Sequence, residues 1–276
     1  MKPREFIKEY GIRSLVCCFS GGKDSLVATH YTLEEIRGIE SGLEIYVVFV
    51  DTTVMLPIAA EYVREVCSRY GWPLKILKPE PDFWTLAKRW GVPSLRRRWC
   101  CFYLKLKPIF EFTRKLTPQR GMVTGLRREE SERRRSRRHV EYVKRMKGLE
   151  VLAWNYHPIL EWTEKDVLRY IRDHDLPMPP HYRMGIKETC MCGAFTHVRE
   201  LLVMKALYPD LFRKFVELEQ DLGEGRSVWF DGKQVFASEL AKQKTLDETG
   251  FKSRGVEREE HASPAHKAEK ARRVIK

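Results

Sequence analysis

The sequence predicts an α/β protein in which a doubly wound, mostly parallel sheet is followed by a helical C-terminal extension. Short apolar runs alternate with segments of helical periodicity over residues 15–77. A glycine-containing turn joins the first apolar run to the first helix, and a helical pattern broken by one proline fills residues 197–222. Strands that alternate with helices form a right-handed parallel sheet with helices on both faces.

The N-terminal elements follow from local pattern. Strands buried on both faces read as continuous apolar runs, whereas helices show apolar residues three and four positions apart. On these grounds we expect strands at 15–19, 43–52 and 74–77, a turn at 20–23, and helices at 25–36 and 59–70. Ligands of such sheets bind beyond the C-terminal strand ends, where the turn at Ser20 and the acidic residue Asp51 lie.

The rest of the chain adds one more strand and a helical extension. We expect a strand at 122–126, a helix at 163–172, a proline-rich loop at 176–182, a helix pair broken near Pro209, and a hairpin turning at Asp231-Gly232. Residues 251–276 are charged and poor in apolar residues, which is typical of a disordered tail. The predicted divisions are 1–225 for the nucleotide-binding domain, 226–250 for the hairpin with a short helix, and 251–276 for the tail.

Composition narrows the function classes. The 276 residues carry a net charge of +13, which favours polyanionic ligands. No apolar run approaches the ~20 residues that span a bilayer, and the N-terminus lacks the apolar segment of a signal peptide, so we expect a cytoplasmic protein without a membrane partner. The seven cysteines are then expected to be buried, metal-bound or reactive rather than disulfide-paired.

The segment FSGGKDS, residues 19–25, has the features of an anion-binding loop. Gly21 and Gly22 allow close backbone approach, and the following helix presents its N-terminus. Lys23 supplies a full positive charge, and Ser20 and Ser25 supply hydroxyl groups. The spacing differs from the Walker pattern, which has four residues between its first glycine and a Gly-Lys pair.

SGGKDS after a buried strand resembles the modified P-loop of the adenine nucleotide α-hydrolases, which include ATP pyrophosphatases and the reductases of phosphoadenylyl sulfate (PAPS) and adenylyl sulfate (APS). The resemblance implies an adenine nucleotide ligand and chemistry at or beside the α-phosphate. Further segments, in the same order, resemble the reductase branch: 50–53, 91–105, 124–134, 158–177 and 187–195. Carried over to this chain, the resemblance implies these nucleotide-binding residues: Ser20, Gly21, Gly22, Lys23, Asp24, Ser25, Asp51, Thr52, Gly125, Arg127 and Arg134.

Two cysteine pairs suggest a metal centre. Cys100 and Cys101 are adjacent, and Cys190 and Cys192 follow 89 residues after Cys101. Four thiolates suit an iron–sulfur cluster or a structural zinc ion. The resemblance to cluster-bearing APS reductases implies a [4Fe–4S] cluster on these four residues, with zinc as the alternative; the CxC spacing departs from the family's CxxC. We expect the neighbouring arginines 96–98 to stabilise the thiolates.

Residues 127–147 hold ten Lys or Arg and four Glu. Arg127 and Arg134 fall on family positions, whereas Arg135, Arg137 and Arg138 exceed the family pattern and fit either a solvated face or a nucleic-acid track.

Three functions remain open. The family's reductases carry a catalytic cysteine near the C-terminus, but the 84 residues after Cys192 contain none, so no catalytic residue is assigned. The first function is a PAPS or APS reductase-like enzyme in sulfur metabolism whose thiol comes from Cys190, Cys192 or a thiol or electron-donor protein. The second is an ATP pyrophosphatase that activates tRNA or DNA for sulfur insertion. The third is a non-catalytic nucleotide-binding module. A homo-oligomer is compatible with each.

Overall fold

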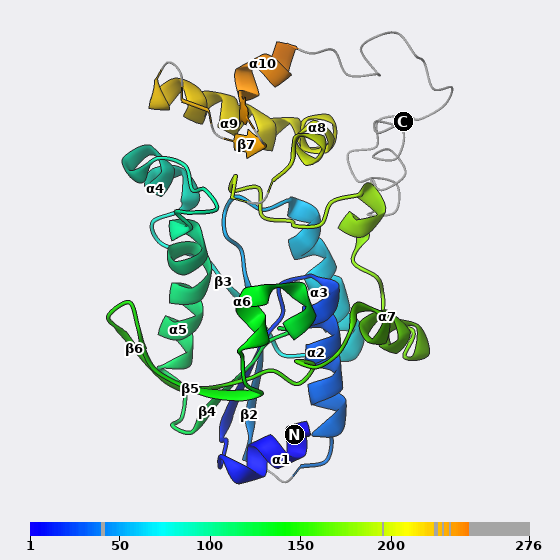
Figure 1. The fold of residues 1–276 in the computed structure, drawn as a ribbon. Helices are drawn as coiled ribbons and strands as arrows, with labels where there is room; N and C mark the ends of the chain where they lie inside the picture. The colour runs from blue at the N-terminus through cyan, green and yellow to red at the C-terminus, as the bar shows by residue number, and fades with distance from the viewer. Residues whose placement is uncertain (40–41, 195, 224–225, 228, 232, 243–276) are drawn as a thin grey trace. The chain divides into compact units, whose positions relative to one another are not determined.

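The computed structural model describes residues 1–39, 42–194, 196–223, 226–227, 229–231 and 233–242 (Figure 1). It divides the chain into two compact units. Unit 1 comprises Met1–Asp51, Ala60–Lys78 and Lys105–Pro179. Unit 2 comprises Thr52–Ala59, Pro79–Leu104 and the described residues from Pro180 onward. The sequence-based boundaries at 225 and 250 stay a prediction, and the predicted tail at 251–276 lies outside the described residues.

Unit 1 is built on a six-stranded sheet of order β3-β2-β1-β4-β6-β5. The first five strands of that order run parallel, and β5 pairs antiparallel with β6 at the edge. The predicted α/β class and mostly parallel sheet are therefore confirmed. The strands are β1 (Ser14–Cys18), β2 (Glu44–Val50), β3 (Leu74–Leu77), β4 (Arg120–Val123), β5 (Val140–Met146) and β6 (Leu149–Tyr156).

Helices cover both faces of this sheet, and Figure 1 shows α2 and α5 on opposite sides of it. One face packs Val16, Val48 and Met122 against Ile109 and Phe110 of α5. Alternation along the strands points Leu15 and Cys17 to the other face, and both are fully buried. The helices that carry residues of this unit are α1 (Pro3–Glu9), α2 (Lys23–Glu35), α3 (Pro57–Tyr70), the π-helix at Cys101–Leu106, α5 (Lys107–Thr113), the 3-10 turn at Arg128–Glu130, α6 (Glu132–Arg135) and α7 (Glu164–Asp173).

Unit 2 is mainly helical around a second core. Its elements are α4 (Phe83–Trp90), a 3-10 turn at Pro180–Met184, α8 (Val198–Leu207), α9 (Pro209–Leu222), β7 (Trp229–Asp231), β8 (Lys233–Val235) and α10 (Ala237–Lys242). Phe83, Phe215 and Trp229 are among its fully buried side chains. The predicted helix break at Pro209 is confirmed, because Pro209 begins α9. The antiparallel strands of the predicted hairpin are confirmed as β7 and β8, whereas Gly232 of its predicted turn lies outside the described residues. The proline-rich segment expected to be a loop ends in a 3-10 turn.

The order of the strands creates a switch point between β1 and β4. The chain leaves β1 toward β2 and β3 on one side, and returns to place β4 and β6 on the other. The segments that follow β1 and β4 therefore emerge side by side at the C-terminal sheet edge, where such folds bind ligands. A Cβ atom on Gly125 would lie 2.5 Å from the carbonyl carbon and oxygen of Asp24 and 2.6 Å from the nitrogen of Ser25. Only glycine fits this contact.

We expect Gly125→Ala to destabilise the protein by about 1–3 kcal/mol, because the added methyl group meets backbone atoms that cannot move aside without shifting the start of α2. Denaturant unfolding of the two proteins measures the difference. Gly121→Ala is the matched control: its Cβ would lie 3.0–3.1 Å from side-chain atoms of Phe6 and Leu15, which can adjust. Equal losses from the two substitutions would contradict the special role of the Gly125 contact.

Candidate functional site

The loop between β1 and α2 has the geometry expected for anion binding. Gly21 adopts φ +83°, in the left-handed region that glycine favours, and Gly22 is the extended residue that caps α2. Gly22 has no side chain that could cap this helix end. Backbone N–H groups at an uncapped N-terminus, together with the helix dipole, favour a negatively charged ligand.

The two serines of the loop hold the loop itself. The Ser25 hydroxyl donates to the Gly22 carbonyl oxygen at 2.9 Å and accepts from the Ser20 N–H at 3.2 Å. Its oxygen lies 3.0 Å from that of Ser20. Because the Ser25 hydroxyl donates its proton to the Gly22 carbonyl oxygen, it accepts a hydrogen bond from the Ser20 hydroxyl. Both serines, expected to donate to the ligand, thus act within the turn.

A network of ion pairs lies at the start of α2. The Lys23 ammonium group is 3.2 Å from the Asp24 carboxylate and 3.3 Å from that of Glu164. The Arg127 guanidinium donates to Asp24 and to Glu129, in each case at 2.6 Å. Asp24, at the N-terminal end of the helix dipole, thus joins the loop to the segment that follows β4.

Lys23 and Arg127 differ in how firmly they are held. The Arg127 side chain is 5% exposed and lies 2.6 Å from both of its carboxylate partners, whereas the Lys23 side chain is 14% exposed and lies 3.2 and 3.3 Å from its partners. Removing a partner from a buried guanidinium leaves a charge without compensation, whereas a longer contact to an exposed carboxylate such as Glu164 contributes less. Arg127 is therefore a fixed support of the loop, and Lys23 can exchange its exposed partner for a ligand.

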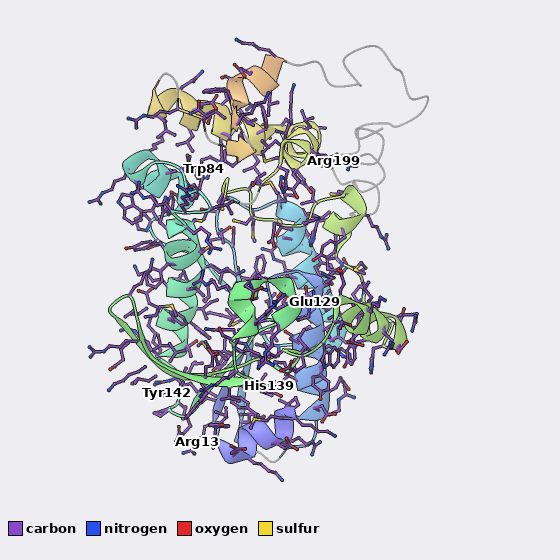
Figure 2. The ribbon with its side chains drawn as sticks, in the orientation of Figure 1. Arg13, Trp84, Glu129, His139, Tyr142 and Arg199 are labelled. Carbon is purple, nitrogen blue, oxygen red and sulfur yellow. The ribbon has the colours of Figure 1, made fainter. Side chains whose placement is uncertain are left out.

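Arg134 joins the same region through a carboxylate. Glu130 accepts from the Arg127 backbone N–H at 3.1 Å and also pairs with the Arg134 guanidinium. Figure 2 labels the neighbouring Glu129. The structure therefore brings together Lys23, Asp24, Arg127 and Arg134, which sequence analysis assigned from widely separated motifs.

Asp51 and Thr52 have different partners although they are adjacent. Asp51, in unit 1, forms an ion pair with Lys78 at 3.6 Å. Thr52 is buried in unit 2, and its hydroxyl lies 3.8 Å from the Cys190 sulfur. Of these two predicted nucleotide-binding residues, Thr52 is directed to a cysteine.

His157 is a residue of this region that sequence analysis did not select. It follows β6 and is 1% exposed, and its Nδ1 lies 2.7 Å from the hydroxyl of Thr124, the residue before Gly125. Burial, with a further contribution from the positive charge of Arg137, lowers the pKa of His157 to about 4. Its Nε2 is buried and has no hydrogen-bond partner among the described residues. A neutral imidazole therefore supports the segment that carries Gly125.

The four predicted metal ligands gather in unit 2. Residues 54–56 pair with 189–191 through Leu56 N–H to Thr189 O at 2.9 Å and Met191 N–H to Val54 O at 3.0 Å, which fixes the second cysteine pair. The Cys100 and Cys192 sulfurs are 3.5 Å apart. Nevertheless, no three His, Cys, Asp or Glu side chains in the described part of the chain are arranged as ligands of one metal ion.

Three thiols in this group, those of Cys100, Cys190 and Cys192, are protonated in the absence of a metal. The neighbouring Cys101 thiol and burial raise the pKa of Cys100 to about 12, and contact with Cys100 and burial raise that of Cys192 to about 12. Contact with Cys192 likewise raises the pKa of Cys190. Burial and thiol–thiol contacts dominate these pKa shifts, and the expectation that arginines 96–98 stabilise metal-bound thiolates stays a prediction. A metal would have to displace protons to bind.

Helix length is relevant to membrane association. Among the described helices, none is long and apolar enough to cross a bilayer.

Comparisons with known proteins match residues of both units to one family. The family model described as the phosphoadenosine phosphosulfate reductase domain matches residues 14–198. The chain is 32% identical over 218 residues to the Methanocaldococcus jannaschii protein MJ0973, covering 78% of this chain and 49% of that protein. It is 29% identical over 187 residues to adenosine 5'-phosphosulfate reductase of Bacillus cereus, covering 64% of this chain and 71% of that enzyme.

The chain spans about half the length of the M. jannaschii relatives, 49% of MJ0973 and 45% of MJ0066. Among solved structures, phosphoadenylyl-sulfate reductase from Candida auris matches with a TM-score of 0.47 at 21% identity, covering 68% of this chain and 87% of that one. The NH3-dependent NAD synthetase from Campylobacter jejuni also has a TM-score of 0.47, at 12% identity, covering 81% and 89%.

The buried neutral His157 predicts a pH dependence of stability. Its folded pKa of about 4 lies below the ordinary value of 6.5, so between these pH values the unfolded chain binds the extra proton. The free energy of unfolding should therefore fall as pH falls from about 6.5 to 4. Denaturant unfolding at a series of pH values measures this slope. In the His157→Gln variant, the free energy of unfolding should change less steeply with pH over that window than in wild type. An unchanged slope would show that His157 is not buried as a neutral group.

Proposed function

We propose a function for this chain from one premise: it belongs to the phosphoadenosine phosphosulfate reductase domain family, whose model matches residues 14–198. In this proposal, unit 1 binds a sulfonucleotide, PAPS or APS, through residues 20–25, and the chain is an enzyme that acts at or beside the α-phosphate. The observation that carries the proposal is the close approach of Gly125 to the backbone of Asp24 and Ser25, which joins the family's two nucleotide-binding motifs at the switch point.

The contacts at the loop suggest how the nucleotide binds. An anionic group at the N-terminus of α2 meets backbone N–H groups and the positive end of the helix dipole. Lys23 then leaves the exposed Glu164 and pairs with the anion, whereas the buried Arg127 keeps its bonds to Asp24 and Glu129. Arg127, which the resemblance assigns to the nucleotide, acts in this proposal by holding the loop.

Release of sulfite from a sulfonucleotide requires two electrons. Cys190 and Cys192 are engaged with each other and, through Cys192, with Cys100, so neither is a free nucleophile in unit 2. We therefore assign the reductant to a thiol or electron-donor protein. The ATP pyrophosphatase alternative uses the same loop and is separated from this proposal by ligand choice.

We also propose that Cys100, Cys101, Cys190 and Cys192 hold a [4Fe–4S] cluster, with zinc as the alternative. The donor chemistry supports this: four thiols come from two distant segments, and two of their sulfurs are 3.5 Å apart. A bound cluster would supply redox chemistry or polarise a nearby ligand, whereas zinc would supply structural stability.

Calorimetry of the full chain with PAPS, APS and ATP in parallel tests the nucleotide proposal. We expect PAPS or APS to bind, and Lys23→Ala to weaken binding at least about tenfold, because a charge-assisted contact to the anion is lost. Gly22→Val should abolish binding altogether, since the valine side chain would crowd the anion. Lys8→Ala, on the exposed surface of α1, is the charge-matched control and should bind like wild type. Binding of ATP alone, with release of pyrophosphate, would favour the alternative, and binding of none of the three would refute nucleotide binding.

Metal analysis of anaerobically purified protein tests the cluster. We expect a brown protein with iron and sulfide each near about four per chain. Cys100→Ser and Cys192→Ser should lose most of this content, because each removes a thiolate ligand. Cys67→Ala should retain it, since Cys67 is a buried thiol of α3 in unit 1. Colourless protein with stoichiometric zinc would replace the redox proposal with a structural one.

A further inference from the structure

The sheet of unit 1 carries a hollow that the nucleotide proposal does not use. It has a volume of about 510 Å³ and lies on the β5–β6 edge, lined by Tyr10, Arg138, Glu141, Tyr142 and Trp154 among others. Figure 2 labels Tyr142 and His139 in this part of the sheet. Nothing in the loop–helix network at Lys23 contributes to it.

Three aromatic rings form the apolar part of the hollow, and we name Tyr10, Tyr142 and Trp154 the aromatic shelf. Tyr142 and Trp154 are direct cross-strand partners, with ring centroids 4.7 Å apart. The ring centroid of Tyr10, at the end of α1, lies 4.5 Å from that of Trp154. Tyr142 is 49% exposed on the edge strand β5.

The charge beside the shelf is positive because the carboxylates of this region have other partners. Each Glu of residues 127–147 is bound by an arginine: Glu129 by Arg127, Glu130 by Arg134, Glu132 by Arg135 and Glu141 by Arg137. By contrast, Arg138 and Lys144 have exposed side chains and form no ion pair within the described part of the chain. Arg138 lines the hollow, and Lys144 lies outside it on β5, at the register shift between Val143 and Arg145.

We propose that the aromatic shelf binds an unpaired base of single-stranded RNA, with the neighbouring phosphates on Arg138 and Lys144. Aromatic rings stack on the exposed faces of bases, and arginine and lysine neutralise the phosphates on either side. In duplex DNA the faces of the bases are covered by their neighbours, so a duplex could use only the charges. An apolar peptide could use the rings but would leave the surplus positive charge without a partner.

Fluorescence anisotropy of the full chain with a labelled ten-nucleotide oligo(U), titrated at several salt concentrations, tests the proposal. Tyr142→Ala should weaken binding at least about fivefold at every salt concentration without changing the salt slope, because it removes stacking and no charge. Tyr142→Phe, which keeps the ring, should bind like wild type. Arg138→Gln and Lys144→Gln should each reduce the slope of log affinity against log salt by about 0.7.

Two controls separate this surface from non-specific charge and from the nucleotide site. Arg213→Gln removes an equal charge from α9 in unit 2, where Arg213 pairs with Asp210, and should leave the slope unchanged. Tyr142→Ala should bind PAPS or APS like wild type, so failure of the nucleotide proposal would not affect this test. Equal binding of RNA by Tyr142→Ala and wild type, equal binding of duplex DNA and oligo(U), or undetectable binding of oligo(U) at low salt would each overturn the proposal.

Discussion

The close contact between Gly125 and the backbone of Asp24 and Ser25 is the constraint on which the rest of unit 1 depends. The two segments meet because β1 and β4 are neighbours at the point where the strand order reverses. The distance between the two segments leaves no room for a side chain at Gly125, so their backbones are in direct contact. The Asp24–Arg127 ion pair then joins the same two segments by charge. Steric fit and electrostatics thus fix the same loop, independently of any ligand.

The two cations of this loop, Arg127 and Lys23, have different roles. A buried guanidinium with two carboxylate partners is expensive to disturb, which suits a structural support. A lysine with an exposed partner can change partners at little cost, which suits a ligand contact. Family resemblance alone gave both residues the same role. The difference arises from the shorter contacts and somewhat deeper burial of Arg127, which depend on how α7 and the segment after β4 pack around the loop.

Much of the fold could be predicted from local sequence. The apolar run before Gly21 and Gly22 predicts a strand, turn and helix, and Pro209 predicts the break between α8 and α9, because these signals act within a few residues. Strands β5 and β6 were missed. The charges of Lys144 and Arg145 on this edge strand, together with a register shift between Val143 and Arg145, hide the alternation of β5.

The site could be predicted only in part, because local sequence motifs are readable but tertiary contacts are not. The motif residues Lys23, Asp24 and Arg127 do meet, but their ion-pair partners Glu129 and Glu164 could not be chosen from sequence, since pairing depends on tertiary packing. His157 was missed because its role requires β6 to lie beside β4, and β6 was not predicted. The aromatic shelf depends on the same pairing of missed strands.

Amide hydrogen exchange with and without saturating PAPS tests the central claim most directly, namely that the nucleotide binds where the segments after β1 and β4 meet. The account predicts that added nucleotide slows exchange together in residues 19–26 and 124–128, because the two backbones are in contact at Gly125. Slower exchange elsewhere in the chain, with neither of these segments affected at saturation, would contradict it.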